Sequence, residues 1–491
     1  AGEDDPAAAT AAPQTDPPDT AAPGTDAAPP ATTADGSVPA TTQAAPVTTL
    51  APLAQFPGCP TDALDAADGP VDVLFWHGMT NELESELIAL TDEYNAGQDQ
   101  VRIELQNQTS YGSTIDKFIN ASQSSRPDLV QLPEYSLQQF AESGTVVPIA
   151  ACLESSGHDT SQFLPRALSA YTYEGIQWSM PFNVSDPVLY YNRKVFVAAG
   201  LDPDDPPVSL EELRAASQQI VDTGAASFGI VIDSGPDSGG GWFIEQWFGR
   251  AGAPYADNGN GRLAPATEVL FDSATGVELM TFVQDMIDDG LAVSVGDNPD
   301  GSQSLLKMVD PESPGAMTIG TSAALGTVIQ VLGSGTFAGL TPEDIGVGPM
   351  PGPSDVPGAQ VGGASLWIVA DKGDAVTAAA WDYITHLTSA QSQSSWAAGT
   401  GYVPVRVDAL DLDPIATTYA EDPRFRVPYD QLQVRADDVT ANAPVLGPQR
   451  EVRVITARAV AAIIGGADVQ TTLTAAVADA NAAIAAYNSL N

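Results

Sequence analysis

The feature that most constrains the fold is an alternation of apolar runs and helical patterns that begins at Val71. The run VDVLFW (71–76) is typical of a buried strand. The helical pattern after it places apolar side chains on one face, at Leu83, Leu87, Leu90 and Tyr94. Further strand-like runs follow at 101–105 and 128–132, with a helical stretch from 114 to 121 between them. Strands and helices that alternate at this spacing predict a parallel sheet in an α/β layer.

Helix and strand signals continue in the rest of the chain. Ser209 and Glu212 have the spacing of a capping box at the start of a helix. The run GGASLWIVA (362–370) is typical of another buried strand. The last helical pattern repeats apolar residues at spacings of four and three, which indicates packing, at Leu473, Val477, Ala480, Ile484 and Tyr487.

Residues 1–56 have a different composition, almost entirely Ala, Pro, Thr, Asp and Gly, with no aromatic residue before Phe56. Such a segment cannot bury enough apolar surface to offset the entropy lost on ordering it. We therefore expect a disordered tether that its prolines extend locally. If a lipid anchor is attached at a residue preceding Ala1, as we hypothesise, this tether is a cell-surface spacer.

The net charge excludes one class of partner. The chain carries 63 acidic and 18 basic residues, for a formal net charge of −45. Binding to nucleic acid depends on a basic surface that releases counterions, so we expect no nucleic-acid partner. High acidity favours solubility in a salty or extracellular setting. The chain has no run of about 18 apolar residues, so no transmembrane helix is predicted.

Cys59 and Cys152 are the only cysteines. An even number of cysteines in an exported chain favours pairing, so we expect a disulfide between them if the protein is exported. The alternative is two unrelated thiols.

The sequence carries no signature of catalysis. Its three histidines, His77, His158 and His386, stand in separate contexts, and no HExxH, GxSxG, Walker A or Cys/His metal pattern occurs. Paired carboxylates are uninformative in so acidic a chain. The stretch DNGNG (257–261) lacks the later glutamate of an EF-hand and is interpreted as a turn. We expect no enzyme, cofactor or metal; a secreted phosphodiesterase or glycosidase is the competing hypothesis.

Four segments carry a resemblance to a known family: FWHGM (75–79), PFNVSDPVLYYNRKVFVAAGLDPDDPP (181–207), GGASLW (362–367) and TGYVP (400–404). In this order they resemble the extracellular solute-binding proteins, in particular the branch that serves glycerol-3-phosphate and glycerophosphodiester importers. The resemblance implies an α/β, two-lobe, periplasmic-binding-protein-like (type II) fold with a ligand cleft between the lobes. The expected division is 57–184 with 316–385 in the N-terminal lobe, and 185–315 with 386–491 in the C-terminal lobe.

The resemblance also implies ligand contacts in both lobes. Tyr111, in TSYGS, matches a tyrosine that reaches the ligand, and Glu134, in LPEYS, matches the glutamate that accepts hydroxyl protons from glycerol. A carboxylate at the C-terminal end of a strand lies where α/β sheets bind ligands. Ser185 matches a serine whose hydroxyl donates to phosphate. Thr321 precedes a helix whose backbone N–H groups suit an anion, and Ser322 is the neighbouring alternative.

Four more positions follow from the resemblance. Gly363 matches a glycine that lets the backbone approach the ligand. Tyr402 matches a tyrosine that binds phosphate or glycerol, and Trp242 alone falls near the two tryptophans that often border the ligand. Arg453, in EVRVI, matches the arginine that pairs with the phosphate, whose oxygens suit a guanidinium fork. Arg450 is close enough in sequence to be confused with it.

These residues imply a binding protein without catalysis. We expect it to capture glycerol-3-phosphate or a glycerophosphodiester such as glycerophosphocholine by closing two lobes, and to deliver it to the membrane permease of an ABC importer. We expect a monomer located outside the cytoplasm, at the cell surface or in the periplasm. The alternative ligand is an oligosaccharide, but sites for those tend to be lined by several aromatic residues and this chain is 7% aromatic.

Overall fold

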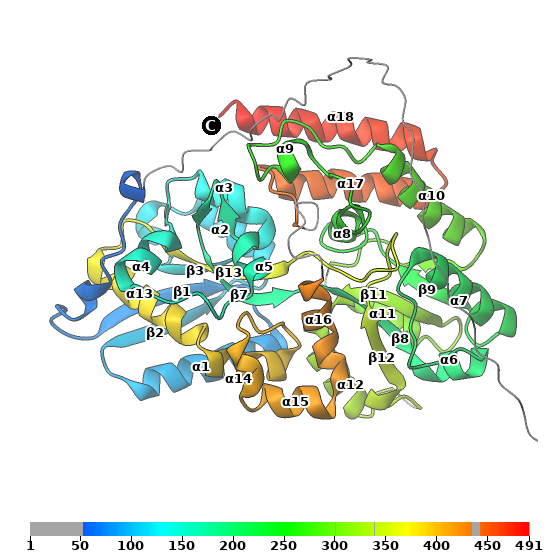
Figure 1. Ribbon diagram of the computed structural model, residues 1–491, viewed down its shortest axis with the longest axis horizontal. Helices are drawn as coiled ribbons and strands as arrows, with labels where there is room; N and C mark the ends of the chain where they lie inside the picture. The colour runs from blue at the N-terminus through cyan, green and yellow to red at the C-terminus, as the bar shows by residue number, and fades with distance from the viewer. Residues whose placement is uncertain (1–52, 300, 338, 435–441, 491) are drawn as a thin grey trace, which may run out of the picture. The chain divides into compact units, whose positions relative to one another are not determined.

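The folded part of the chain begins slightly earlier than predicted. The computed structural model describes residues 53–299, 301–337, 339–434 and 442–490 (Figure 1). Most of the predicted tether therefore lies outside the described residues. Its last residues, however, form a 3-10 helix at Leu53–Gln55, and the Phe56 ring packs edge-on against Trp178, with 5.0 Å between centroids. The predicted boundary at 57 is late because the aromatic partner of Phe56 lies far along the chain.

One sheet is built mainly from the first part of the chain. Its strand order is β2–β1–β3–β13–β4, and β7 also pairs with β13. Its strands are β1 (Val71–His77), β2 (Val101–Asn107), β3 (Leu129–Pro133), β4 (Val146–Val147), β7 (Met180–Ser185) and β13 (Gly362–Val369). As predicted, β1 is parallel to β2 and β3, but β13 is antiparallel to β3, β4 and β7. A buried apolar run has the same composition in either direction, so the pattern did not distinguish these orientations.

A second sheet has the order β10–β9–β11–β8–β12. Its strands are β8 (Pro187–Asn192), β9 (Phe228–Ile232), β10 (Ala292–Ser294), β11 (Gly315–Thr321) and β12 (Ile345–Pro349). We predicted that 316–385 belongs to the N-terminal lobe, and this is wrong for β11 and β12, because β11 pairs with β8 and β9, and β12 pairs with β8. A strand pattern does not say which sheet the strand joins. The other lobe boundaries stay predictions.

The two sheets are directly connected. Only Asp186 separates the last residue of β7 from the first residue of β8, so the chain passes from one sheet to the other within a single extended segment. The chain returns to the first sheet between β12 and β13. A short hairpin of β5 (Thr172–Tyr173) and β6 (Ile176–Gln177) forms a third, two-stranded sheet.

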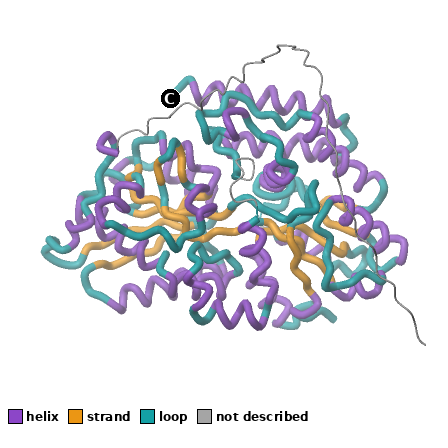
Figure 2. Tube along the Cα trace, viewed as in Figure 1, coloured by secondary structure: helices purple, strands orange, loops and turns teal. Residues whose placement is uncertain are grey.

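Helices surround both sheets, with the strands inside (Figure 2). In the first half of the chain they are α1 (Asn81–Gly97), α2 (Tyr111–Asn120), α3 (Leu137–Ala141), α4 (Ile149–Ser156), α5 (Pro165–Ala170), α6 (Arg193–Ala199), α7 (Leu210–Thr223) and α8 (Trp242–Arg250). In the second half they are α9 (Asp257–Asn260), α10 (Ala274–Asp288), α11 (Ser302–Met308), α12 (Leu325–Gly333), α13 (Asp374–Leu387), α14 (Ala390–Thr400), α15 (Ile415–Glu421), α16 (Val427–Gln433), α17 (Gln449–Ile464) and α18 (Val469–Asn488). The α/β class is confirmed.

Local signals placed several of these helices correctly. The capping box at Ser209 and Glu212 is present at the start of α7, because each side chain bonds the backbone N–H of the other residue. DNGNG, interpreted as a turn, contains the short element α9, within which Asn258 and Gly259 have non-helical backbone angles. No helix in the described part of the chain is both long enough and apolar enough to span a bilayer.

Two connections fix parts of the first sheet and its surroundings. Cys59 and Cys152, the latter in α4, form a disulfide.

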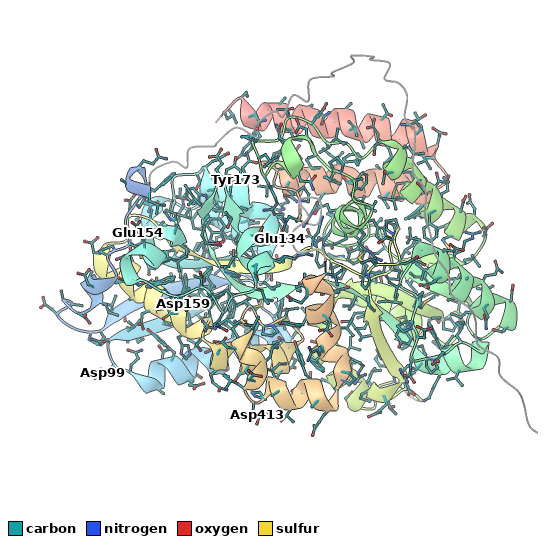
Figure 3. The ribbon with its side chains drawn as sticks, viewed as in Figure 1. Asp99, Glu134, Glu154, Asp159, Tyr173 and Asp413 are labelled. Carbon is teal, nitrogen blue, oxygen red and sulfur yellow. A yellow bond between two sulfur atoms is a disulfide. The ribbon has the colours of Figure 1, made fainter. Side chains whose placement is uncertain are left out.

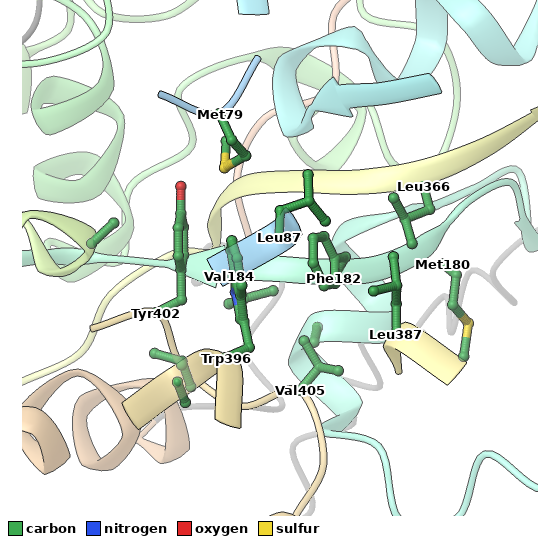
Figure 4. Packing of buried hydrophobic residues seen from close by; sticks show 14 of the residues in the cluster. Met79, Leu87, Met180, Phe182, Val184, Leu366, Leu387, Trp396, Tyr402 and Val405 are labelled. Atoms are coloured by element: carbon green, nitrogen blue, oxygen red, sulfur yellow. The ribbon is translucent and has the colours of Figure 1, made fainter. Parts of the chain in front are cut away.

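An aromatic stack lies beside β7: the ring of Phe182 packs on Trp396, and Trp396 in turn packs on Tyr402, with centroid distances of 4.9 and 5.5 Å (Figure 4). Tyr402 thus has a rigid apolar support on one side, which restricts the position of its hydroxyl.

Candidate ligand-binding site

Arg453 is the residue around which the candidate site is built. It lies in α17 with its side chain only 2% exposed. Its Nε donates to Glu245 Oε1 at 2.8 Å and its Nη2 to Glu245 Oε2 at 2.7 Å, the two-point geometry of a guanidinium fork. Nη2 also donates to Glu134 Oε1 at 3.0 Å. Arg453 therefore links α17 and α8 to the residue that follows β3.

The charges around Arg453 do not balance. Two buried carboxylates, Glu134 and Glu245, face one buried guanidinium, and the exposed carboxylate of Asp237 lies 3.5 Å from Nη1. Burial raises the pKa of Glu134 to about 7, although the nearby Arg453 opposes this rise. The site thus holds a carboxyl group that titrates close to neutral pH.

We expect Glu134→Gln to stabilise the protein more at pH 8 than at pH 5. The folded-state pKa of about 7 lies above the ordinary value of 4.5, so wild-type stability falls as pH rises through this window. Glutamine does not ionise, so the variant avoids that loss. The gain in the free energy of unfolding should therefore be about 2–3 kcal/mol larger at pH 8 than at pH 5. Denaturant unfolding at both pH values measures it. Glu154→Gln, which removes an exposed glutamate of α4, is the control (Figure 3). A Glu134→Gln effect that is the same at both pH values would contradict the assignment.

A second group of polar side chains lies on β3, β7 and α2. Asn183 of β7 donates from Nδ2 to the Tyr111 hydroxyl at 2.8 Å, and its Oδ1 accepts from Gln131 Nε2 of β3 at 2.8 Å. The hydroxyl oxygens of Tyr111 and Tyr402 lie 3.4 Å apart. Two of the predicted ligand residues, Tyr111 and Tyr402, are thus side by side, with Asn183 holding one of them in place.

Two adjacent glycines allow close packing at the start of β13. Gly363 has a φ of +89°, and a Cβ built there would lie 2.0 Å from the carbonyl oxygen of Asn183. A Cβ on Gly362 would lie 2.2 Å from the Trp242 ring. Gly362 also pairs in register with Ser185 at the end of β7. The glycines bring Trp242 and Ser185 to the same strand end.

Thr321 and Ser322 lie at the end of β11, beside the point where the chain crosses between the sheets at Asp186. The Thr321 hydroxyl accepts from the backbone N–H of Ala323 at 3.3 Å, so it caps the helix that follows. The backbone N–H of Ser322 donates a hydrogen bond to the carbonyl oxygen of Asp186 at 2.9 Å, and the Ser322 hydroxyl accepts from the Asp186 N–H at 3.4 Å. Both predicted residues therefore stabilise the connection next to Ser185, and a ligand role for them stays a prediction.

Arg450, the alternative to Arg453, has a different environment. It lies one turn earlier in α17 and donates to Asp116 Oδ1 of α2 at 2.7 Å. Both side chains of this ion pair are about half exposed, at 47% and 61%. Of the two arginines, Arg453 is the buried one, and it is also the one that the family resemblance favoured.

The contacts of Glu245, Asn183 and Asp237 with predicted site residues were not anticipated. Glu245 is fully buried in the sequence WFIEQWF, and a buried acid needs a charged or hydrogen-bonding partner. That signal could have drawn attention to Glu245, but its partner lies 208 residues away. Asn183 is part of the segment 181–207 that carries the resemblance, but neither Asn183 nor Asp237 had a signal that distinguished it from its neighbours.

One protein family matches most of the chain. A sequence profile of the bacterial extracellular solute-binding proteins matches residues 89–426. The chain belongs to this family. It is a family of binding proteins rather than enzymes, which agrees with the absence of catalytic signatures in the sequence.

Within this family, the chain is similar in sequence to proteins that are named for binding sn-glycerol-3-phosphate. The sn-glycerol-3-phosphate-binding periplasmic protein UgpB of Brucella melitensis is 28% identical over 425 residues, which cover 84% of this chain and 93% of that protein. UgpB of Rhizobium meliloti is 28% identical over 430 residues, covering 86% and 95%. The solute-binding chain thus matches these relatives over nearly their whole length.

Solved structures support the fold. The crystal structure of UgpB from Mycobacterium tuberculosis in complex with glycerophosphocholine has a TM-score of 0.68 at 22% identity, covering 85% of this chain and 98% of that one. The GacH receptor of Streptomyces glaucescens, solved unliganded and with acarbose, has a TM-score of 0.67 at 20% identity, covering 84% and 97%. The two-lobe fold of solute-binding proteins is thereby confirmed.

Proposed function

We propose that this solute-binding protein captures sn-glycerol-3-phosphate or a glycerophosphodiester for an ABC importer. The observation that carries the proposal is the buried Arg453 guanidinium, within 3.0 Å of Glu134 at the end of β3. Glu245 occupies Nε and Nη2, so Nη1, whose contact with the exposed Asp237 is 3.5 Å, is the donor that a phosphate oxygen would approach. A carboxylate suits the hydroxyl groups of glycerol. The UgpB relatives are named for binding sn-glycerol-3-phosphate, which supports the same chemistry here.

The charge balance at Arg453 favours a phosphodiester over a phosphomonoester. Glu134, Glu245 and Asp237 already place three carboxylates within 3.5 Å of the guanidinium. A monoester brings a charge of about −1.5 to −2 at neutral pH, whereas a diester brings a single negative charge. The added repulsion is therefore smaller for a diester. A headgroup with a positive charge would reduce the repulsion further, since Asp237 is 63% exposed beside the site.

Closure of the lobes would hold such a ligand. Several side chains link helices packed on the second sheet to elements of the first: Arg453 of α17 to Glu134, Arg450 of α17 to Asp116 in α2, and the Tyr487 hydroxyl of α18 to Glu142 Oε2 after α3. These contacts come from two helices, α17 and α18, and can form together only when the lobes are close. In this proposal the ligand adds to them and shifts the population towards the closed form.

Parallel calorimetric titrations test the proposal. We expect heat from glycerophosphocholine and sn-glycerol-3-phosphate, with tighter binding of the diester, and no heat from maltose. Binding of maltose alone would contradict the proposed ligand and would indicate an oligosaccharide-binding protein of the same fold. Equal affinity for the two phosphates would reject the charge argument while retaining the ligand class.

The proposal has three further parts, of which the anchor rests on the composition of residues 1–56. These are delivery to a membrane permease, the monomeric state, and a lipid anchor attached before Ala1. They stay predictions.

A further inference from the structure

Tyr171 carries a buried hydroxyl group that has no assigned role. The residue follows α5 directly and is 0% exposed. Within the ranges that the structure describes, its hydroxyl oxygen has no hydrogen-bond partner. A buried polar group without a partner is unfavourable, and buried tyrosine hydroxyls usually find one. The position therefore needs an explanation.

Three other tyrosines that are at most 1% exposed follow the usual rule. Their hydroxyl groups bond a backbone carbonyl or a threonine hydroxyl: Tyr190 to the Thr321 carbonyl at 2.8 Å, Tyr383 to Thr91 at 2.6 Å and Tyr255 to Thr456 at 3.1 Å. The Tyr171 hydroxyl lacks such a bond among the described residues, although Tyr171 is buried to the same extent. Tyr419 in α15 is a second exception, also buried and also unpartnered in the described part of the chain.

The surroundings of Tyr171 are those of the candidate site. Tyr171 belongs to the same buried cluster as Tyr402 and Val184 of β7, and Tyr111 packs against that cluster. Burial raises the pKa of the Tyr171 hydroxyl, and the Glu134 carboxylate and the Tyr402 hydroxyl raise it further. The Tyr111 hydroxyl is affected by Tyr171 in the same way. Helix α5, which ends just before Tyr171, packs on β7, the strand that carries Asn183. The Tyr171 hydroxyl is thus placed with the group of Tyr111 and Tyr402, on the side of the neighbouring Glu134.

We infer that the Tyr171 hydroxyl donates a hydrogen bond to a hydroxyl oxygen at the glycerol end of the ligand, beside Glu134. This inference rests on the proposed function. A ligand hydroxyl can accept from Tyr171 and donate its own proton to the Glu134 carboxylate at the same time. The ligand would thereby supply the partner that the described residues do not provide. Tyr419 provides no such opportunity, since the groups that most affect its hydroxyl include Tyr429 and Asp186 but neither Glu134 nor Tyr402.

The variants Tyr171→Phe and Tyr419→Phe form a matched pair for a test. Each removes only one unpartnered buried hydroxyl, so neither should lower the melting temperature of the ligand-free protein. Titration with sn-glycerol-3-phosphate and with glycerophosphocholine then separates them. We expect Tyr171→Phe to bind both ligands about tenfold more weakly, by a similar factor because both share the glycerol end. Tyr419→Phe should bind as the wild type does.

Each other outcome overturns the inference in a recognisable way. Wild-type affinity in Tyr171→Phe would mean that the hydroxyl bonds a water molecule or nothing. A melting temperature that falls for Tyr171→Phe alone would indicate a structural partner. Loss for glycerophosphocholine alone would place the hydroxyl at the headgroup. If the wild type binds neither phosphate, the proposed function fails and the inference fails with it, which is distinct from a wild type that binds and a variant that binds equally well.

Discussion

Replacement of Arg453 by alanine is expected to destabilise the fold and to abolish tight ligand binding. The variant would leave Glu245, which is fully buried, without its bidentate partner. Breaking a buried ion pair from one side costs about 3–5 kcal/mol, because a charge remains buried without compensation. Denaturant unfolding should show a loss of this size. Ligand affinity should fall by about 2–5 kcal/mol when the buried positive partner is lost.

A double variant separates these two effects. Arg453→Met combined with Glu245→Leu removes both members of the pair and fills their space with apolar side chains. Such a replacement is often neutral or stabilising, so most of the lost stability should return. Binding should not return, since the guanidinium is still absent. A double variant that is stable and still binds the ligand with wild-type affinity would show that Arg453 is structural only.

Local sequence patterns were sufficient to predict many elements of the fold, because they depend on near neighbours. The capping box of α7 needs only Ser209 and Glu212, three residues apart, and the apolar face of α18 needs only its own periodicity. Sheet membership depends on distant partners. The strand at 315–321 pairs with 187–191 and 228–231, and nothing in its composition says so. The error in the predicted lobe division arose there.

The candidate site shows the same limit. Tyr111, Glu134, Tyr402 and Arg453 were found because each lies in a short segment that matches the family, and the structure joins them in two neighbouring groups. Glu245 was missed because its importance comes from a partner 208 residues away. Tyr171 was missed for a related reason: a buried tyrosine is ordinary in a core, and only the three-dimensional structure shows that its hydroxyl has no hydrogen-bond partner among the described residues.

Removal of the disulfide is expected to cause the other large loss of stability. Cys59 and Cys152 are 93 residues apart in sequence, and a cross-link that closes so long a loop restricts the unfolded chain strongly. The loop-closure estimate is about 4.7 kcal/mol for 100 residues, and measured losses for native disulfides are about 2–5 kcal/mol. We therefore expect Cys59→Ser/Cys152→Ser to unfold at lower denaturant concentration, with a free energy of unfolding lower by about 2–5 kcal/mol.

Reductant provides the control for this expectation. The wild type treated with dithiothreitol should become as unstable as the double serine variant, and the variant itself should not respond. Because neither cysteine belongs to the groups around Arg453 and Tyr111, glycerophosphocholine should bind the folded variant with unchanged affinity. If reductant weakened both proteins equally, its effect would not come from this bond. If the variant kept wild-type stability, the folded contacts around the short helix at Thr61–Leu64 and α4 would suffice without the cross-link.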